Sequence, residues 1–271
     1  MPELPEVEIT TQTLNKIIKP PEIVEEWIFY RKDLRHKIPI TKIKKLNGSE
    51  LKKITRRAKF IIFEFANESI VSHLGMTGFW RIEKKGWARK THDHIAMKIN
   101  DDKFLVYNDP RRFGEFDLFK NTNLHERFKH FGPEPLDKKI DWAQVTQVFK
   151  KLSTSVKVAL MNQKYLVGVG NIYASEALFR SGIKPQKKAS LVTAAQYEKL
   201  WTEVKKVLQE SINAGGSSIS DFKNSYGEKG DFQNRFLVYD REGELCRTCH
   251  QPIYAMVLGG RSTFWCKNCQ K

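Results

Sequence analysis

The sequence has no long run of apolar residues. Hydrophobic residues make up 40% of its 271 positions, but no stretch reaches the roughly 18 consecutive apolar residues that a membrane-spanning helix requires. The first eight residues are acidic and carry no apolar run, so they do not resemble a secretory signal. Internal repeats and low-complexity tracts are missing as well. We therefore expect a globular protein, not embedded in a membrane, that works in the cytoplasm or is associated with the nucleoid there.

Negative charge is scarce relative to positive charge. Lysine and arginine number 47 against 31 aspartates and glutamates, which gives a formal net charge of +16 and an isoelectric point near 9.6. A cationic surface attracts polyanions at long range, and nucleic acid is the commonest such partner. An anionic membrane surface is an alternative, but no basic amphipathic helix stands out to support it. A generally basic protein kept in solution by its charge also fits the composition.

Cysteine is rare and confined to one end of the chain. Cys246, Cys249, Cys266 and Cys269 form two C-x-x-C pairs with 16 residues between them. Two such pairs joined by a short hairpin match the ligand spacing of a zinc ribbon, in which four thiolates hold one Zn²⁺ tetrahedrally. Two disulfides or a redox pair are alternatives, which the paired spacing and a reducing cytoplasm disfavour. The cysteines therefore predict one structural zinc ion.

The segment between the two cysteine pairs is predicted to form a β-hairpin. A hairpin of this size is too small for a core of its own, so the metal supplies its folding energy. Gly259 and Gly260 stand directly before Arg261. This order places the Arg261 cation at the functional end of the hairpin.

The hydrophobic pattern divides the chain into three parts. Residues 5–19 are typical of a helix, since Pro5 suits its first turn and the proline pair at 20–21 ends it. Short strand-like runs follow at 38–46, 60–65, 70–74, 95–99, 104–107 and 116–119, and they favour a β-sandwich. Helical periodicity follows at 142–152, 156–161, 172–181 and 193–214. The predicted fold class is α+β and multidomain: a β-sandwich with an N-terminal helix over 1–134, a helical domain over 135–234 and a zinc finger over 235–271.

The N-terminus is a candidate reactive site. Methionine is commonly removed before a small residue, and its removal would leave Pro2 with a free secondary amine. An α-amine has a pKa of about 7.7 to 8.0, so a useful fraction is neutral at pH 7, and a neutral amine can attack a sugar C1′. Glu3 would lie within reach to move protons, and Glu6 follows one helical turn later. The plainer alternative is that proline and glutamate simply begin a helix well.

Two further motifs suit contacts to phosphate groups. The glycine turn at 168–170 precedes Asn171 and a helix N-terminus, whose amides can bind a phosphate together with the Asn171 side chain. The basic run at 56–59 ends with Lys59 before an apolar strand and can also grip phosphates. A Gly-x-Gly turn alone is weak support, and the basic run fits a solvated strand end equally well.

Arg111 and Phe113 lie in an Asp-Pro-Arg-Arg-Phe-Gly turn after a strand. Such side chains can enter a base stack as intercalating wedges do, although an ion-paired turn with Phe113 in the core is an alternative. His73 and Met76 are ambiguous, since a lone histidine or methionine is usually structural. The two histidines at 92–94 share one face of a strand, and without a further ligand pair we interpret them as structural.

These elements together resemble the formamidopyrimidine-DNA glycosylase family along essentially the whole chain. The matching elements occur in the family's order: residues 2–8, 73–76, 109–114, 166–176 and the four-cysteine ribbon. Any one of them alone would carry little weight, but all five together are highly specific. The resemblance implies a β-sandwich with an N-terminal helix, a helical domain with a helix–two-turns–helix motif and a zinc finger, with DNA in the cleft between.

The resemblance also implies a mechanism. Mature Pro2 attacks C1′ of an oxidised purine nucleotide, such as 8-oxoguanine or a formamidopyrimidine, and Glu3 assists by proton transfer at the sugar. The resulting Schiff base drives β- and δ-elimination, so the enzyme is both a glycosylase and an abasic-site lyase. Glu6 matches a supporting acid. Lys59 and Arg261 complete the catalytic set that the resemblance implies.

DNA contacts follow from the same resemblance. Phosphate contacts are implied for four residues: Lys59, His73, Asn171 and Arg261. Three residues would fill the gap left by the everted nucleotide: Met76, Arg111 and Phe113. Arg111 would face the orphaned base, typically cytosine, and a loop at 223–233 would close over the lesion. Because a base inside a duplex hides its C1′ from an amine, the nucleotide must first leave the stack. The expected partner is therefore double-stranded DNA with an oxidised base, bound by a monomer.

Three alternatives remain open at this point. A sister class of glycosylases removes oxidised pyrimidines, but it usually has glycine at the position of Leu4 and lacks the turn at 109–114. A zinc-dependent DNA-binding or damage-sensing protein without catalysis would need the same basic cleft but no free proline amine. An RNA-binding ribosomal or translation factor explains the charge and the zinc but not the N-terminus.

Overall fold

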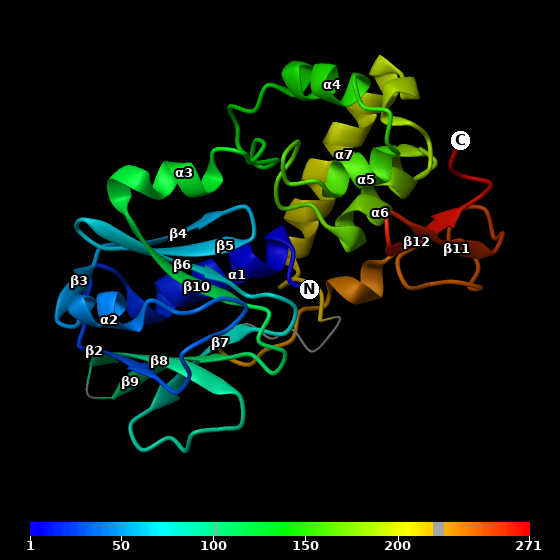
Figure 1. The fold of residues 1–271 in the computed structure, drawn as a ribbon. Helices are drawn as coiled ribbons and strands as arrows, with labels where there is room; N and C mark the ends of the chain where they lie inside the picture. Colours follow the sequence, from blue (N-terminus) through cyan, green and yellow to red (C-terminus); the bar gives the residue numbers. More distant parts are fainter. Residues whose placement is uncertain (101, 219–224) are drawn as a thin grey trace. The chain divides into compact units, whose positions relative to one another are not determined.

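The chain forms two compact units, each with its own hydrophobic core. The computed structural model describes residues 1–100, 102–218 and 225–271 (Figure 1). The first unit comprises Met1–Lys129 and Ala214–Asp231, and the second comprises His130–Asn213 and Phe232–Lys271. Of the predicted loop at 223–233, residues 223 and 224 lie outside the described residues. No helix in the described part of the chain is long and apolar enough to cross a membrane.

Helix α1, Leu4–Ile18, begins where the sequence predicts a helix. Pro5 stands in its first turn, and Glu3 and Glu6 form a capping box that satisfies amide groups at the helix start. Its apolar face buries side chains such as Val7 and Leu14 in the core of the first unit. Lys19 adopts a left-handed conformation and ends the helix.

Two four-stranded antiparallel sheets form the body of the first unit and appear as two layers in Figure 1. One sheet has the strand order β10-β6-β5-β4, and the other has the order β2-β8-β9-β7. The bounds are β2 Glu26–Phe29, β4 Lys53–Arg57, β5 Phe60–Glu64, β6 Glu68–His73, β7 Phe79–Lys84, β8 Asp93–Asn100, β9 Lys103–Asn108 and β10 Glu115–Lys120. A smaller sheet pairs β1, Glu22–Val24, with β3, Ser49–Leu51.

Aromatic side chains from both sheets fill the space between the two layers. Phe63 of β5 packs edge-on against Trp27 of β2 and Trp80 of β7, with ring centroids 6.4 and 5.5 Å apart. Phe116 of β10 contacts Trp27 and Trp80 as well. Burying these large rings supplies much of the hydrophobic stabilisation of the unit. The predicted β-sandwich with an N-terminal helix is confirmed.

The strand expected at 38–46 is wrong. This segment forms a short helix α2, Ile40–Ile43, followed by a 3₁₀ turn, Lys44–Leu46. Its apolar residues Ile40, Ile43 and Leu46 recur every three positions, so they share one face of a helical turn. Alternation with lysines gave a false strand pattern. A 3₁₀ turn at Asn121–Asn123 and helix α3, Leu124–Phe128, follow the last sandwich strand.

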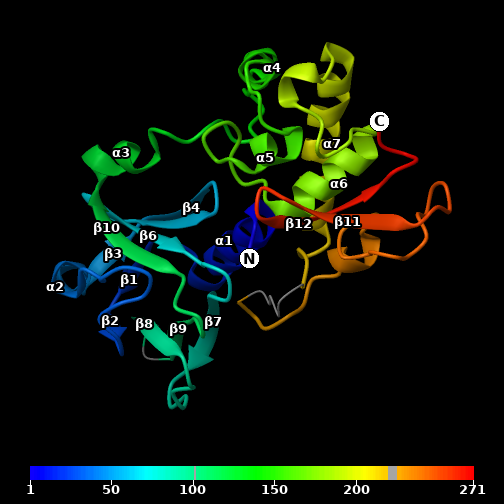
Figure 2. The same ribbon diagram turned by 45° about the vertical axis from the view of Figure 1, so that its right-hand side comes forward.

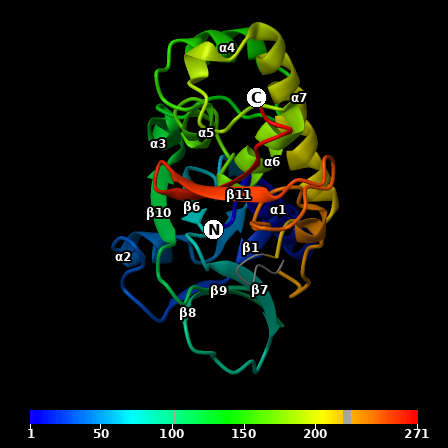
Figure 3. The ribbon, with the colours of Figure 1, turned by 90° about the vertical axis from the view of Figure 1, so that its right-hand side faces the viewer.

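Four helices dominate the second unit (Figure 3): α4 Trp142–Lys150, α5 Val156–Met161, α6 Asn171–Ser181 and α7 Ala194–Asn213. Short 3₁₀ turns lie at Ala189–Leu191 and Phe232–Arg235. Helix α6 is buried along most of its length because α5, α7 and the C-terminal hairpin all pack against it. Gly182 ends it in a left-handed conformation. The four predicted helical segments are confirmed within one to two residues at most ends.

The C-terminal hairpin pairs β11, Ile253–Leu258, with β12, Arg261–Cys266 (Figure 2). Gly259 and Gly260 form the turn and both have positive φ, 59° and 70°, as a two-residue turn that matches the strand twist requires. A Cβ atom on Gly259 would lie 2.7 Å from Val158 Cγ2 of α5. The hairpin tip therefore packs against α5, and only glycine fits at this contact.

Candidate functional site

The start of α1 concentrates two buried carboxylates beside Pro2. Pro2 is buried, while Glu3 and Glu6 are 3% and 2% exposed. The Glu3 amide donates to Glu6 Oε2 at 2.9 Å. A helix N-terminus stabilises such negative charge by its dipole and its unpaired amides. Met1 is 42% exposed, so the residue that would have to be removed to free the Pro2 amine is accessible.

Glu6 also holds a segment that is distant in the sequence. Its Oε1 accepts hydrogen bonds from Ser217 N at 2.9 Å and from Ser217 Oγ at 3.2 Å. Gly216, with φ of 82°, approaches so closely that a Cβ atom there would lie 3.3 Å from the same carboxylate oxygen. The Glu6 carboxylate thus bridges the start of α1 and residues 216–217, which we call the stem of the segment Ala214–Asp231. No sequence motif pointed to Ser217.

Lys59 lies in the turn between β4 and β5 and is only 6% exposed. Ala58 beside it has a φ of 53°, and its carbonyl accepts a hydrogen bond from Arg56 Nη1 at 2.8 Å. Arg56 Nε also donates to Glu8 Oε2 of α1 at 2.7 Å. The Arg56–Glu8 ion pair therefore ties the turn that carries Lys59 to the helix that begins at Pro2.

His73 ends β6 and is held in one tautomer. The Gly75 amide donates to His73 Nδ1 at 3.0 Å, which leaves the proton on Nε2. Burial, reinforced by the positive charge of Lys59, lowers the pKa of His73 from 6.5 to about 4. Its ring packs against Phe60, with centroids 4.7 Å apart. His73 is therefore a neutral hydrogen-bond donor at pH 7, which suits a phosphate oxygen without adding a cation.

Met76, Arg111 and Phe113 lie on two neighbouring loops of the first unit. A Cβ atom on Gly75 would lie 2.4 Å from the carbonyl carbon of Phe113, so the two loops touch through their backbones. Phe113 is 45% exposed, and the Arg111 guanidinium lies 4.7 Å from the centre of its ring. The alternative that Phe113 belongs to the core is excluded.

His94 is buried in the fold, whereas the side chain of His92 is exposed and lies just before β8. Asp93 between them is fully buried and accepts a bidentate pair from Arg81 at 2.6 and 2.7 Å. His94 Nε2 lies 2.9 Å from the Asp109 carbonyl oxygen. Within the described residues, the only group of three or more side chains placed to hold a metal ion is the four-cysteine cluster. These contacts agree with the structural interpretation of His94, while His92 lies outside the strand that was expected to carry both residues.

Asn171 and the hairpin are joined by a buried lysine in the second unit. Lys157 of α5 is 0% exposed, and its Nζ donates to Asn171 Oδ1 at 2.5 Å, to Thr263 Oγ1 at 2.6 Å and to Ser262 O at 3.2 Å. Asn171 Nδ2 donates to Ser262 O at 2.9 Å. The start of α6 is thereby fixed beside the strand that begins at Arg261, which is exposed. A lysine inside the apolar sequence of α5 was the available signal for this role, and sequence reasoning missed it.

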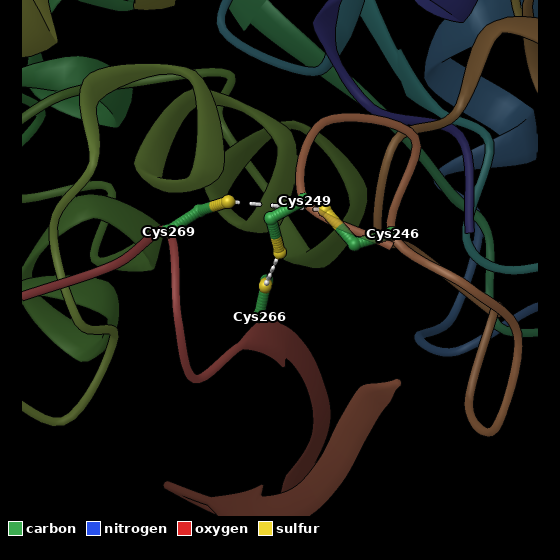
Figure 4. Close-up of side chains that lie close together, drawn as sticks. All are labelled: Cys246, Cys249, Cys266 and Cys269. Atoms are coloured by element: carbon green, nitrogen blue, oxygen red, sulfur yellow. Dashed lines mark hydrogen bonds between the residues drawn. The ribbon is translucent and has the colours of Figure 1, made fainter. Parts of the chain in front are cut away.

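The four cysteines converge on one point, as Figure 4 shows. Their sulfur atoms all lie within 4.8 Å of one another. The Cys249–Cys266 and Cys246–Cys269 sulfur distances are 3.4 and 3.9 Å. Tetrahedral zinc with Zn–S bonds of about 2.3 Å requires sulfur separations of about 3.8 Å, so the cluster fits one zinc ion. The zinc ribbon closes the hairpin at the end opposite its Gly259-Gly260 turn.

The predicted residues are divided between the two units. The first unit contains Pro2, Glu3, Glu6, Lys59, His73, Met76, Arg111 and Phe113. The second contains Asn171, Arg261 and the four cysteines. Within each unit, the residues are linked by the hydrogen bonds and backbone contacts described above.

Three family models match successive parts of the chain. Residues 1–116 match the formamidopyrimidine-DNA glycosylase N-terminal domain, residues 131–223 match the formamidopyrimidine-DNA glycosylase H2TH domain, and residues 243–271 match the zinc finger found in FPG and IleRS. The second of these names refers to the helix–two-turns–helix motif.

Relatives match over the full length of the chain. A formamidopyrimidine-DNA glycosylase of Bdellovibrio bacteriovorus is 48% identical over 271 residues and covers all of both chains. One from Methylococcus capsulatus is 39% identical over 272 residues with the same coverage. The crystal structure of wild-type Lactococcus lactis Fpg (MutM) with DNA containing N7-benzyl-Fapy-dG has a TM-score of 0.92, 32% identity and full coverage of both chains. A complex of Lactococcus lactis Fpg with abasic-site DNA gives 0.91 and 33%, with 99% of each chain covered.

We predict that His73 titrates near pH 4. The proton signal of its ring should shift with a midpoint near 4 in an NMR titration from pH 3 to 8, with the His73→Gln variant used to assign the signal. The unfolded chain binds this proton at about pH 6.5. The stability that neutral His73 contributes is therefore present above pH 6.5 and is lost as the pH falls towards 4. A midpoint near 6.5 would contradict the buried, neutral assignment.

We predict that Cys266→Ser removes the metal. Wild-type protein should contain one zinc per chain by elemental analysis, and the variant well below one, because three thiolates hold zinc less tightly than four. Amides of β11 and β12 should then exchange faster with solvent. Lys267→Ser, an exposed neighbour, is the matched control and should keep its zinc. Full zinc content in Cys266→Ser would show that the ribbon is not the metal site.

Proposed function

The chain belongs to the formamidopyrimidine-DNA glycosylase family, and on that basis we propose that Pro2 is its catalytic nucleophile. The protein is a base-excision repair enzyme. It is a DNA glycosylase with abasic-site lyase activity that acts on oxidised purines. The observation that carries the assignment of the nucleophile is the start of α1. There the buried Pro2 precedes two buried carboxylates, those of Glu3 and Glu6, and the backbone amide of Glu3 donates a hydrogen bond to the Glu6 carboxylate.

The reaction begins once Met1 has been removed. Glu3 donates a proton to the ring oxygen of the sugar as the lone pair of the Pro2 nitrogen attacks C1′ of the damaged nucleotide, and the bond between C1′ and the ring oxygen breaks. The Pro2 nitrogen then passes its own proton to the base, the bond between C1′ and the base nitrogen breaks, and the base leaves with that electron pair. A cationic Schiff base between Pro2 and C1′ remains. The Schiff base withdraws electrons, so C2′ loses a proton and the 3′ phosphate leaves by β-elimination. The 5′ phosphate leaves in the following δ-elimination.

Glu6 supports this chemistry without contacting the reacting atoms. Its carboxylate accepts hydrogen bonds from the Glu3 amide and from Ser217, so it fixes both the turn before α1 and the stem of Ala214–Asp231. A carboxylate with three buried donors has little freedom to rotate. We therefore assign Glu6 to positioning Pro2 and Glu3.

Four residues are assigned to the DNA backbone: Lys59, His73, Asn171 and Arg261. They comprise two cations, a neutral imidazole donor and an amide at a helix start. Such groups position a nucleic acid without reading its sequence. Lys59 and Arg261 also act in catalysis by fixing the phosphates that flank the reacting sugar.

Met76, Arg111 and Phe113 are assigned to the space that the everted nucleotide leaves. Base eversion costs a few kcal/mol, and inserted side chains offset part of that cost. The exposure of Phe113 and its stacking with Arg111 support this role, because exposed apolar and cationic groups in contact suit a stack of bases. Arg111 then faces the orphaned base, for which cytosine is the expected partner.

We also propose a three-part division of the chain, with a catalytic sandwich domain over 1–134, a helical DNA-binding domain over 135–234 and a zinc finger over 235–271. The matches to the three family models support this division. The loop at 223–233 is proposed to close over the lesion. We further propose that the enzyme works as a monomer in the cytoplasm, on the DNA of the nucleoid.

Substrate class is tested by comparing single-turnover excision of 8-oxoguanine and of thymine glycol from otherwise identical duplexes. We predict faster excision of 8-oxoguanine. Faster excision of thymine glycol would place the substrate in the oxidised-pyrimidine class.

Glu3→Gln should slow base release by at least about 100-fold, because proton transfer at the sugar is lost, while the protein still binds lesion DNA. Unchanged base release in Glu3→Gln would remove Glu3 from the mechanism.

A salt titration separates phosphate contacts from internal contacts. Affinity for DNA falls as the salt concentration rises. We predict that Arg261→Ala reduces the magnitude of this slope, measured as log affinity against log salt concentration, by about one. Lys157→Met should weaken binding without changing the slope, because the Lys157 ammonium is buried and bonded to protein oxygens. An unchanged slope in Arg261→Ala would exclude a phosphate contact, and a reduced slope in Lys157→Met would show that this lysine reaches the DNA.

A further inference from the structure

Thr77 and Asp109 connect the two loops that carry the proposed gap-filling residues. Met76 directly precedes Thr77 in the loop between β6 and β7, and Arg111 lies in the turn between β9 and β10. Thr77 Oγ1 donates a hydrogen bond to Asp109 Oδ1 at 2.6 Å. The Arg111 amide donates to the same hydroxyl at 3.2 Å. One hydroxyl group therefore links the Met76 loop to both the first residue of the turn and the backbone of Arg111.

Asp109 holds the rest of the turn. Its side chain is fully buried, and Oδ2 accepts a hydrogen bond from the Gly114 amide at 2.8 Å. Its carbonyl oxygen accepts one from the Arg112 amide at 3.2 Å and lies 2.9 Å from His94 Nε2. The polar atoms of Asp109 thus bind the middle and the end of the turn that this residue begins.

The turn needs this support because its backbone is strained. Arg112 has a φ of 57°, in the left-handed region that side chains other than glycine rarely adopt. Such conformations persist only where the surrounding structure fixes them, and they occur most often at functional sites. Losing one of the fixing hydrogen bonds would let the turn relax to other shapes. The direction of the exposed Arg111 side chain depends on that shape, since its guanidinium packs only loosely, over the Phe113 ring at 4.7 Å.

We propose that Thr77 is a positioning residue that sets how strictly the enzyme distinguishes the base opposite the lesion. Its hydroxyl fixes the backbone of Arg111 through one direct hydrogen bond and through Asp109. The inference rests on the proposed role of Arg111 in facing the orphaned base. Thr77 touches neither the reacting sugar nor the lesion in this account, and it acts through Arg111 alone.

Valine tests this role because it matches the shape of threonine. Thr77→Val keeps the packing of this partly buried side chain, but it deprives Asp109 Oδ1 of its donor and the Arg111 amide of its acceptor. Thr77→Ser keeps both hydrogen bonds. Thr122→Val, at an exposed threonine after β10, is the matched control.

The experiment measures single-turnover excision of 8-oxoguanine opposite cytosine and opposite adenine. The ratio of the two rates is compared among wild type, Thr77→Val, Thr77→Ser, Arg111→Ala and the double variant Thr77→Val/Arg111→Ala. We expect Thr77→Val to lower the ratio about tenfold, because the buried Asp109 carboxylate loses a donor and the Arg111 amide loses its acceptor. Thr77→Ser and Thr122→Val should keep the wild-type ratio. In the Arg111→Ala background, Thr77→Val should cause no further change.

The outcomes separate this inference from the proposed function. A wild-type ratio in Thr77→Val, with a reduced ratio in Arg111→Ala, would overturn the role of Thr77 and leave that of Arg111. A further loss in the double variant would also overturn it, because Thr77 would then act independently of Arg111. A wild-type ratio in Arg111→Ala would refute the proposed role of Arg111 and this inference with it. Thermal unfolding of Thr77→Val provides a check that the fold is intact.

Discussion

The Glu6 carboxylate is the contact on which the proposed reactive centre depends. It lies at the start of α1, where the helix dipole favours negative charge. It binds the Glu3 amide through one oxygen and Ser217 through the other. The residue before the helix and a stem more than 200 positions away are thereby held by a single buried group. A nucleophile at the end of a chain needs such an anchor, since chain ends are otherwise poorly ordered.

Two further anchors of the same kind exist, one in each unit. In the first unit, buried Asp109 fixes the turn that presents Arg111 and Phe113. In the second, buried Lys157 fixes Asn171 and the hairpin strand that begins at Arg261. In both cases a buried polar group bonded to several partners orients exposed side chains that are proposed to contact DNA. Such networks are costly if one partner is missing and stabilising when complete.

The sequence predicted the elements with strong periodicity and the site residues that lie in local motifs. The helix at α1, the β-sandwich and the four-cysteine ribbon all follow from patterns within a few residues. The segment at 38–46 failed because alternating lysines imitate a strand. Ser217, Lys157 and Thr77 were missed for a different reason: their partners Glu6, Asn171 and Asp109 are between 14 and 211 positions away. Nothing in the local sequence distinguishes a hydroxyl that completes a distant network from one that faces solvent, and the local signal for Lys157 was its place in the apolar sequence of α5.

The covalent role of Pro2 is tested most directly by borohydride reduction during the reaction. Protein would be incubated with a duplex carrying 8-oxoguanine opposite cytosine, reduced, digested and mapped by mass spectrometry. We expect a single DNA adduct on the peptide that begins at Pro2, with Met1 absent. An adduct on a lysine, or no adduct from protein that lacks Met1 and contains zinc, would contradict the central claim that the proline amine is the nucleophile.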